Sequence, residues 1–159
     1  MKIGVISDTH LSKPTEALCQ LQHGVFADVF MILHAGDLTE LDVLHAFFDK
    51  EVVAVSGNMD SSMVKNQLPS KRIIEVAGFR IGLTHILGKP FTSAKGLMAG
   101  FDQVNAIVYG HTHRPVNEVR DGILFFNPGA FYGSTPFLGR GSVGILTLGE
   151  ELRGQIITL

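Results

Sequence analysis

Short apolar runs, separated by glycine, proline and polar clusters, make up most of the chain. Residues 2–7, 28–34 and 51–56 are compact apolar runs of the kind found in buried strands. Residues 14–23 and 40–50 lie between them and predict helices. The order strand-helix-strand-helix-strand predicts right-handed crossovers and parallel strands.

A local sequence feature supports each of the two predicted helices. Pro14 falls in the first turn of the first helix, and Gly24 lies just past its end. The second helix has an apolar face, which is made by Leu41, Leu44, Phe47 and Phe48.

The pattern changes to antiparallel pairs in the second half. Three hairpins are predicted, at residues 72–76 with 79–84, 116–119 with 123–126, and 143–148 with 154–159. A strand is predicted at residues 106–109, and a helix interrupted by Gly96 at residues 92–101. No linker, repeat or low-complexity stretch divides the sequence, so we expect one α/β domain over residues 1–159 with a mixed or double sheet.

Composition excludes several classes of protein. Of the 159 residues, 45% are hydrophobic and 18% are charged, which excludes disorder. The net charge of −2 argues against general nucleic-acid binding. No run approaches the roughly 18 apolar residues of a membrane span, and the first apolar run is too short for a signal peptide. With Cys19 as the single cysteine, we expect a cytoplasmic protein with no membrane partner.

A polar cluster follows each of five apolar runs. The clusters are Asp8-Thr9-His10, Gly36-Asp37, Gly57-Asn58-Met59-Asp60, His85 and Gly110-His111-Thr112-His113. Because ligands of open α/β sheets bind beyond the carboxyl ends of strands, these clusters are expected to converge. The pairs Asp8/His10 and His111/His113 would point the same way from extended segments, and the glycines would permit sharp turns.

Carboxylate, amide oxygen and imidazole are together the ligands of borderline divalent metals. Any one cluster is also explained as turn chemistry or as a satisfied loop histidine. Their joint occurrence favours a metal site, and seven ligand groups exceed one tetrahedral zinc and suit two metals that share a carboxylate. The remaining histidines lack this context: His23 and His45 are ordinary helix residues, and His34 either orients a ligand or is simply buried.

This spaced series resembles the calcineurin-like metallophosphoesterases, and the short length resembles their small YfcE-type phosphodiesterases. The resemblance implies two packed mixed β-sheets flanked by helices, an αββα sandwich with a binuclear metal site at one sheet edge. It implies that Asp8, His10 and His113 hold one metal, and that Asn58, His85 and His111 hold the second. Asp37 would bridge the two.

The implied activity is hydrolysis of a small-molecule phosphodiester by hydroxide held between two divalent metals. Mn²⁺ is the first expectation for the metals, with Ni²⁺, Fe²⁺ and Zn²⁺ as alternatives. Arg114 and Arg140 are candidates to contact substrate phosphate, although a solvated loop arginine explains each as well. The sequence leaves open the physiological substrate, the native metal and the oligomeric state, a homo-oligomer included.

The sequence departs from the family pattern in three places. Met59 stands where many members have a histidine that is proposed to protonate the leaving group, and a thioether cannot donate a proton. This favours substrates with good leaving groups, and Asp60 is then expected to brace its loop. Ile86 follows His85 in place of the usual glycine, and Ala130 replaces a common serine.

Thr9 and Thr112 are expected to brace loops, and the role of residues 130–141 is open.

Two alternative functions remain. One is a phosphomonoesterase or nucleotide-specific hydrolase that uses the same site. The other is a non-catalytic scaffold, since a subunit of the eukaryotic retromer complex resembles this family while lacking part of the metal set. Because all seven ligand positions are filled here, the sequence favours an enzyme.

Overall fold

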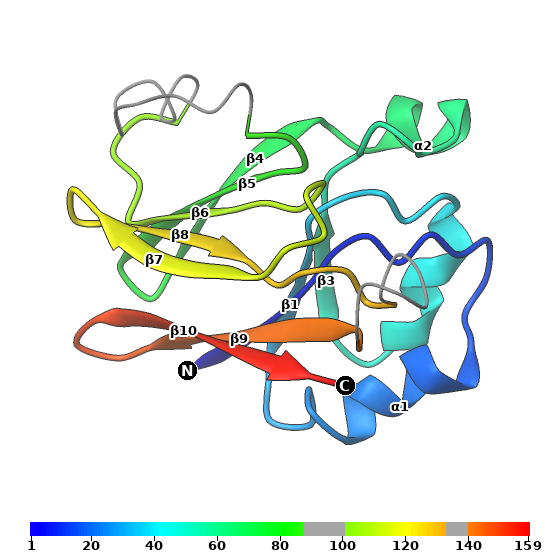
Figure 1. Cartoon of the computed structure of the whole chain (residues 1–159), viewed down its shortest axis with the longest axis horizontal. Helices are drawn as coiled ribbons and strands as arrows, with labels where there is room; N and C mark the ends of the chain where they lie inside the picture. Colours follow the sequence, from blue (N-terminus) through cyan, green and yellow to red (C-terminus); the bar gives the residue numbers. More distant parts are fainter. Residues whose placement is uncertain (88–100, 133–139) are drawn as a thin grey trace.

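The computed structural model describes residues 1–87, 101–132 and 140–159, in which two five-stranded sheets pack face to face (Figure 1). The first sheet has the order β10 (Leu152–Thr158), β9 (Ser142–Leu148), β1 (Lys2–Ile6), β2 (Met31–His34), β3 (Glu51–Ala54). The second has the order β4 (Lys71–Val76), β5 (Phe79–Thr84), β6 (Ala106–Val108), β8 (Ile123–Asn127), β7 (Val116–Arg120).

Both sheets are mixed, which confirms the predicted fold class. Strands β1, β2 and β3 run parallel, and β9 pairs antiparallel with β1. In the second sheet β5, β6 and β8 are parallel, and β4 and β7 are antiparallel edge strands. The three predicted hairpins are confirmed as β4/β5, β7/β8 and β9/β10.

Alternation along β1 distributes its side chains between two cores. Ile3 and Val5 are fully buried between the two sheets, against residues such as Leu83 and Phe126. Ile6 points to the other face and packs with the helices. A strand buried on both faces can be apolar throughout, which explains the compact apolar run that the sequence shows here.

The described helices contribute to the core on the outer face of the first sheet. These are α1 (Glu16–His23), the 3₁₀ helix η1 (Leu41–Phe47) and the short α2 (Ser62–Gln67). Thr15 caps α1, since its side chain accepts a hydrogen bond from the backbone N–H of Leu18. No helix is predicted where α2 lies; it begins after Ser61 and is only 6 residues long.

The helix predicted at residues 40–50 is present, but as a 3₁₀ helix. Of its predicted apolar face, Phe47 is buried and Leu41 and Leu44 pack against the core, so only Phe48 was assigned wrongly. In a 3₁₀ helix the side chains at i and i+3 align, so Val43 and Ala46 are buried together. Phe48, assigned to the apolar face, lies beyond the helix and is 78% exposed. Of the predicted helix at residues 92–101, only Phe101 lies within the described residues, and it is buried against Ile107 and Phe125.

The fold brings the carboxyl ends of β1, β2, β3, β5 and β6 to one edge, where the two sheets face each other. The five polar clusters lie in the loops that follow these strands. No helix in the described part of the chain is long and apolar enough to cross a membrane.

Candidate metal centre

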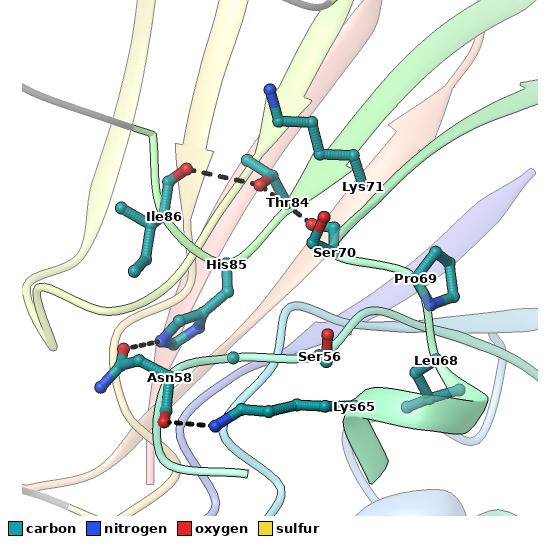
Figure 2. Close-up of a pocket in the computed structure, with 11 residues that line it drawn as sticks. Ser56, Asn58, Lys65, Leu68, Pro69, Ser70, Lys71, Thr84, His85 and Ile86 are labelled. Atoms are coloured by element: carbon teal, nitrogen blue, oxygen red, sulfur yellow. Dashed lines mark hydrogen bonds between the residues drawn. The ribbon is translucent and has the colours of Figure 1, made fainter. Parts of the chain in front are cut away.

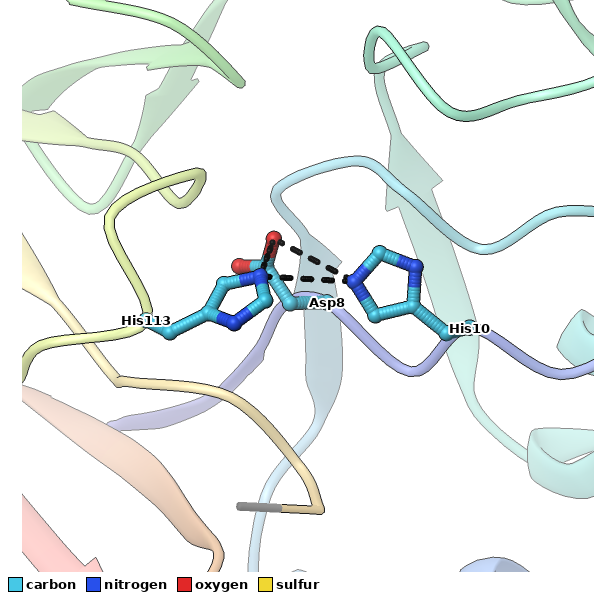
Figure 3. A group of neighbouring side chains, drawn as sticks. All are labelled: Asp8, His10 and His113. Carbon is cyan, nitrogen blue, oxygen red and sulfur yellow. Dashed lines mark hydrogen bonds and ion pairs between the residues drawn. The ribbon is translucent and has the colours of Figure 1, made fainter. Parts of the chain in front are cut away.

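Asp8, His10 and His113 form the first group of donor side chains (Figure 3). His113 Nε2 lies 3.1 Å from Asp8 Oδ1, and His10 Nε2 lies 3.9 Å from the same oxygen. The two Nε2 atoms are 3.3 Å apart, although the two histidines are 103 residues apart in the sequence. These are the three residues that the family resemblance implies for the first metal.

A second group shares Asp8 with the first and adds Asp37 and His85, all three of them buried. His85 Nε2 lies 3.1 Å from Asp37 Oδ2 and 4.0 Å from Asp8 Oδ1. Asn58 extends this group, because its Oδ1 lies 3.1 Å from the same His85 nitrogen (Figure 2). In this structure the carboxylate common to both groups is Asp8; the bridging role of Asp37 stays a prediction.

His111 lies beside the second group rather than within it. Its ring centroid is 5.3 Å from that of His85, and its imidazole is exposed. Its backbone N–H donates to Asp8 Oδ2 at 3.1 Å. The structure thus gathers all seven predicted residues at one edge, and the role of His111 as a ligand stays a prediction.

The free oxygen of Asp8 fits a bound cation. Asp8 Oδ2 is occupied, because it accepts hydrogen bonds from Ser7 Oγ at 2.6 Å and from the backbone of His111. Asp8 Oδ1 is buried and accepts no hydrogen bond from any described residue, while three imidazoles surround it. A buried carboxylate oxygen without a partner is costly, and a divalent ion would satisfy it.

The orientation of His85 gives a second indication of a cation. Its Nδ1 lies 2.8 Å from the carbonyl oxygen of Ala35, so Nδ1 carries the hydrogen and donates. When this imidazole is neutral, the lone pair of Nε2 faces oxygens of Asn58, Asp37 and Asp8, none of which can donate a hydrogen bond to it; when it is protonated, Nε2 donates to Asp37 instead. Four acceptor atoms that point at one space are the donor set of a metal site.

The contact between Asp37 and His85 shifts the pKa values of both side chains. Burial lowers the pKa of His85, but the hydrogen bond with Asp37 and the one to Ala35 outweigh it, so its pKa is raised. Burial raises the pKa of Asp37, but hydrogen bonds from His85 and the backbone of Met59 outweigh it, so its pKa is lowered. Positive charge beside Asp37 is thus stabilised, whether a proton or a metal ion supplies it.

Five predicted ligands have left-handed backbone conformations. Their φ angles are 54° for Asp8, 49° for His10, 55° for Asp37, 67° for His111 and 57° for His113. The prediction of extended segments for the Asp8/His10 and His111/His113 pairs is therefore wrong. Each such residue costs about 1 kcal/mol. Backbone hydrogen bonds to Gly36 and Asp37 from residues 8 and 10, both 3.0 Å long, help to hold the first pair.

Close packing, rather than a sharp turn, explains the glycines at 57 and 110. A Cβ at Gly57 would overlap Asp37 Oδ1, and a Cβ at Gly110 would overlap Ser7 Oγ. Neither has a positive φ, in contrast to Gly36, whose φ is 90°. The glycines let the backbone lie directly against the two carboxylates.

Asp60 holds the loops of the second group, which confirms its predicted bracing role. Its Oδ2 accepts from the backbone N–H groups of Gly57 at 2.6 Å and Asp37 at 3.2 Å. Its Oδ1 accepts from the N–H of Thr39 at 2.6 Å. One buried carboxylate therefore fixes the loop after β2 relative to the loop after β3.

His34 connects the loops after β1 and β2 and is fully buried. The N–H of Gly36 donates to its Nδ1 at 3.2 Å, so Nε2 carries the hydrogen and meets Thr9 Oγ1 at 3.2 Å. Burial, assisted by the positive potential of His85, lowers its pKa to about 3. His34 is therefore neutral, and it positions the backbone between predicted ligands.

Asn127, at the end of β8, is a positioning residue that is not among the residues singled out from the sequence. Its Nδ2 donates to the carbonyl of Gly110 at 2.8 Å and to Thr112 Oγ1 at 3.1 Å. Its Oδ1 accepts from the N–H of Gly129. These contacts hold the loop of His111 and His113, and they confirm that Thr112 braces it.

The two predicted arginines lie in different places. Arg114 is exposed and directly follows His113 at the edge of the site. Arg140 lines a separate groove between α1 and the C-terminus, together with Phe131, Tyr132 and Leu159. None of the seven predicted ligands lines that groove. A phosphate contact remains a prediction for Arg114, and the geometry offers no support for one at Arg140.

Two facing sheets with seven metal-type donors at one edge define a metallophosphoesterase. The sequence matches the calcineurin-like phosphoesterase superfamily domain over residues 1–151, and the chain belongs to this superfamily. It is 38% identical to a probable metallophosphoesterase of Methanothermobacter thermautotrophicus, over 99% of this chain and 92% of the relative.

Solved structures support the same fold. An archaeal phosphodiesterase is 25% identical with a TM-score of 0.74, and the match covers 100% of both chains. Vps29 from Entamoeba histolytica, in a crystal structure with Zn²⁺, is 22% identical with a TM-score of 0.71 over 99% of both chains. The likeness to Vps29 concerns the fold alone.

Proposed function

We propose that this metallophosphoesterase is a phosphodiesterase with a binuclear divalent-metal centre. The observation that carries the proposal is the pair of donor groups that share the unpartnered oxygen of Asp8. Asp8, His10 and His113 would hold one ion, and Asn58, His85 and His111 would hold the second. Asp37 would bridge the two ions, and Asp8 lies close enough to contribute to both sites. Mn²⁺ is the proposed metal, and a small-molecule phosphodiester in the cytoplasm is the proposed substrate.

When bound, two such ions polarise the phosphoryl oxygens and supply hydroxide from water near neutral pH. The protein itself holds the ligand side chains in fixed positions. Asp60, His34 and Asn127 hold the loops that carry the ligands, so little reorganisation is needed when substrate binds. The imidazoles must be neutral to act as ligands, so activity is expected to fall at acid pH.

The test is hydrolysis of bis(p-nitrophenyl) phosphate by chelator-treated protein, with Mn²⁺, Ni²⁺, Zn²⁺ or Mg²⁺ then added back. We expect activity to be lost with the metal and restored by Mn²⁺. Activity that persists in the chelated protein would refute the metal-dependent function. Metal binding without hydrolysis would favour the scaffold alternative, and faster hydrolysis of p-nitrophenyl phosphate would favour a phosphomonoesterase.

The side chain of Met59 is 62% exposed beside Asn58 and offers no proton to a leaving group. Its backbone N–H is already used, since it donates to Asp37 Oδ1 at 2.7 Å. Leaving groups that need protonation are therefore expected to react slowly. Aryl phosphodiesters are expected to be better substrates than alkyl phosphomonoesters.

Replacement Met59→His should raise kcat/KM for glycerol phosphate about tenfold, because an imidazole beside the site can protonate the leaving alkoxide. Phosphate release would measure the change. Met63→His is the matched control, because Met63 is similarly exposed (60%) but lies on α2, where neither of its neighbours in the sequence is a predicted ligand. An equal response of both variants would argue against position 59 as the place of the missing acid.

A further inference from the structure

A pocket of about 530 Å³ opens directly beside the candidate metal centre (Figure 2). Asn58 and His85 line it and also belong to the second donor group, so pocket and metal centre share a wall. The volume lies in the range of small-molecule sites. A substrate whose phosphoryl group is bound at the metal centre can therefore extend one arm into this pocket.

Among the described residues that line the pocket, the charged ones are all cationic. Lys65 of α2 and Lys71 of β4 line it, and none of the described lining residues is an aspartate or a glutamate. The Lys65 ammonium donates to the main-chain carbonyl of Asn58 at 2.9 Å. Among the described residues no carboxylate pairs with Lys65, so its charge is directed to the pocket without compensation. An ammonium has two further donors for an incoming anion.

Apolar side chains occupy other parts of the lining. Leu68 and Pro69 lie at the far side from Asn58, and Ile86 lies next to His85 (Figure 2). Such a lining suits a carbon skeleton that carries one anionic group. A neutral substrate arm would make no ion pair with the lysine, and a cationic substrate arm would be repelled by it.

We propose that this pocket is a specificity subsite for substrates that carry a second phosphate on the arm bound there, and that Lys65 receives this phosphate. The inference rests on the proposed phosphodiesterase function and adds the substrate class. It predicts discrimination between two substrates that react at the same kind of phosphodiester but differ in charge beyond it.

Two chromogenic substrates test the proposal. They are the p-nitrophenyl ester of thymidine 5′-phosphate and the same ester with an additional 3′-phosphate. Both release p-nitrophenolate, so the leaving group is constant. The natural protein should show about tenfold higher kcat/KM for the ester with the 3′-phosphate, mainly through a lower KM. The Lys65→Met variant should reduce this preference to about twofold or less.

Lys50→Met is the matched control. Lys50 is partly exposed and likewise donates to a main-chain carbonyl, that of Ala27 at 3.0 Å, but it does not line the pocket. This variant should keep the full preference. Equal kcat/KM values for the two esters in the natural protein, or an unchanged preference in Lys65→Met, would overturn the subsite and leave the phosphodiesterase function standing.

A binding measurement distinguishes failure of the proposed subsite from failure of the proposed phosphodiesterase function. Titration calorimetry of the Mn²⁺-loaded protein should give about tenfold tighter binding of thymidine 3′,5′-bisphosphate than of thymidine 5′-phosphate, and Lys65→Met should remove the difference. If neither ester is hydrolysed but this difference in Kd appears, the subsite stands and the proposed function fails. Equal Kd values would refute the subsite even if hydrolysis occurs.

Discussion

The Asp8→Asn variant should lose about a thousandfold in kcat/KM for bis(p-nitrophenyl) phosphate, which corresponds to about 4 kcal/mol of transition-state stabilisation. Asp8 is the carboxylate common to both donor groups, so one substitution weakens both proposed metal sites. The amide oxygen can still accept the hydrogen bonds from Ser7 and from the N–H of His111, so the loop is expected to keep its shape. Steady-state kinetics with added Mn²⁺ would measure the loss.

The same substitution should have the opposite effect on metal-free stability. In the presence of chelator, the free energy of unfolding should rise by about 1 kcal/mol, because a buried carboxylate oxygen without a partner is replaced by a neutral group. Urea denaturation with and without Mn²⁺ would show both changes. Asp42→Asn is the control, since that side chain is 73% exposed. A metal-free Asp8→Asn variant several kcal/mol less stable than the natural protein would contradict this account of Asp8.

The metal-free protein should lose about 2 kcal/mol of stability through His34 alone when the pH falls from 6.5 to 4.5. The pKa of His34 is lowered from 6.5 to about 3 in the folded state, chiefly because the imidazole is buried. Between pH 6.5 and 3, His34 is therefore protonated in the unfolded chain and neutral in the folded chain. The contribution of His34 is complete above pH 6.5 and decreases steadily as the pH falls toward 3.

Comparison with His34→Asn isolates this contribution. Asparagine can accept the hydrogen bond from Gly36 through Oδ1, but it does not titrate. The variant should be less stable than the natural protein at pH 7.5, and the gap between the two should narrow by about 3 kcal/mol at pH 4.5. Urea denaturation in chelator at several pH values measures this. His45→Asn, at a histidine that is 78% exposed, should leave the pH dependence unchanged; a constant gap for His34→Asn would show that His34 is not the group responsible.

Two sequence predictions differ from the structure in backbone conformation. The helix at residues 40–50 was assigned from a period of 3.6, but seven of its residues form a tighter 3₁₀ helix whose buried face includes Val43 and Ala46. The Asp8/His10 pair was assigned an extended backbone, but contacts to Gly36 and Asp37 hold it in the left-handed region. The conformation of this pair is therefore decided by a segment that is far away in the sequence.

The sequence by itself determined the strands, the three hairpins and the seven candidate ligands. Apolar periodicity, turn residues and the identity of the side chains after each strand are local properties. They can be recognised without knowing which segments of the chain pack together.

Only the tertiary structure decided how those ligands are grouped. It placed His113 beside His10 across 103 residues, and it made Asp8 the shared carboxylate. It also set Lys65 at a pocket beside His85 and buried His34 between two loops. The physical reason is that distances between side chains depend on how the two sheets pack, and packing brings together residues whose spacing along the chain carries no information about their contact.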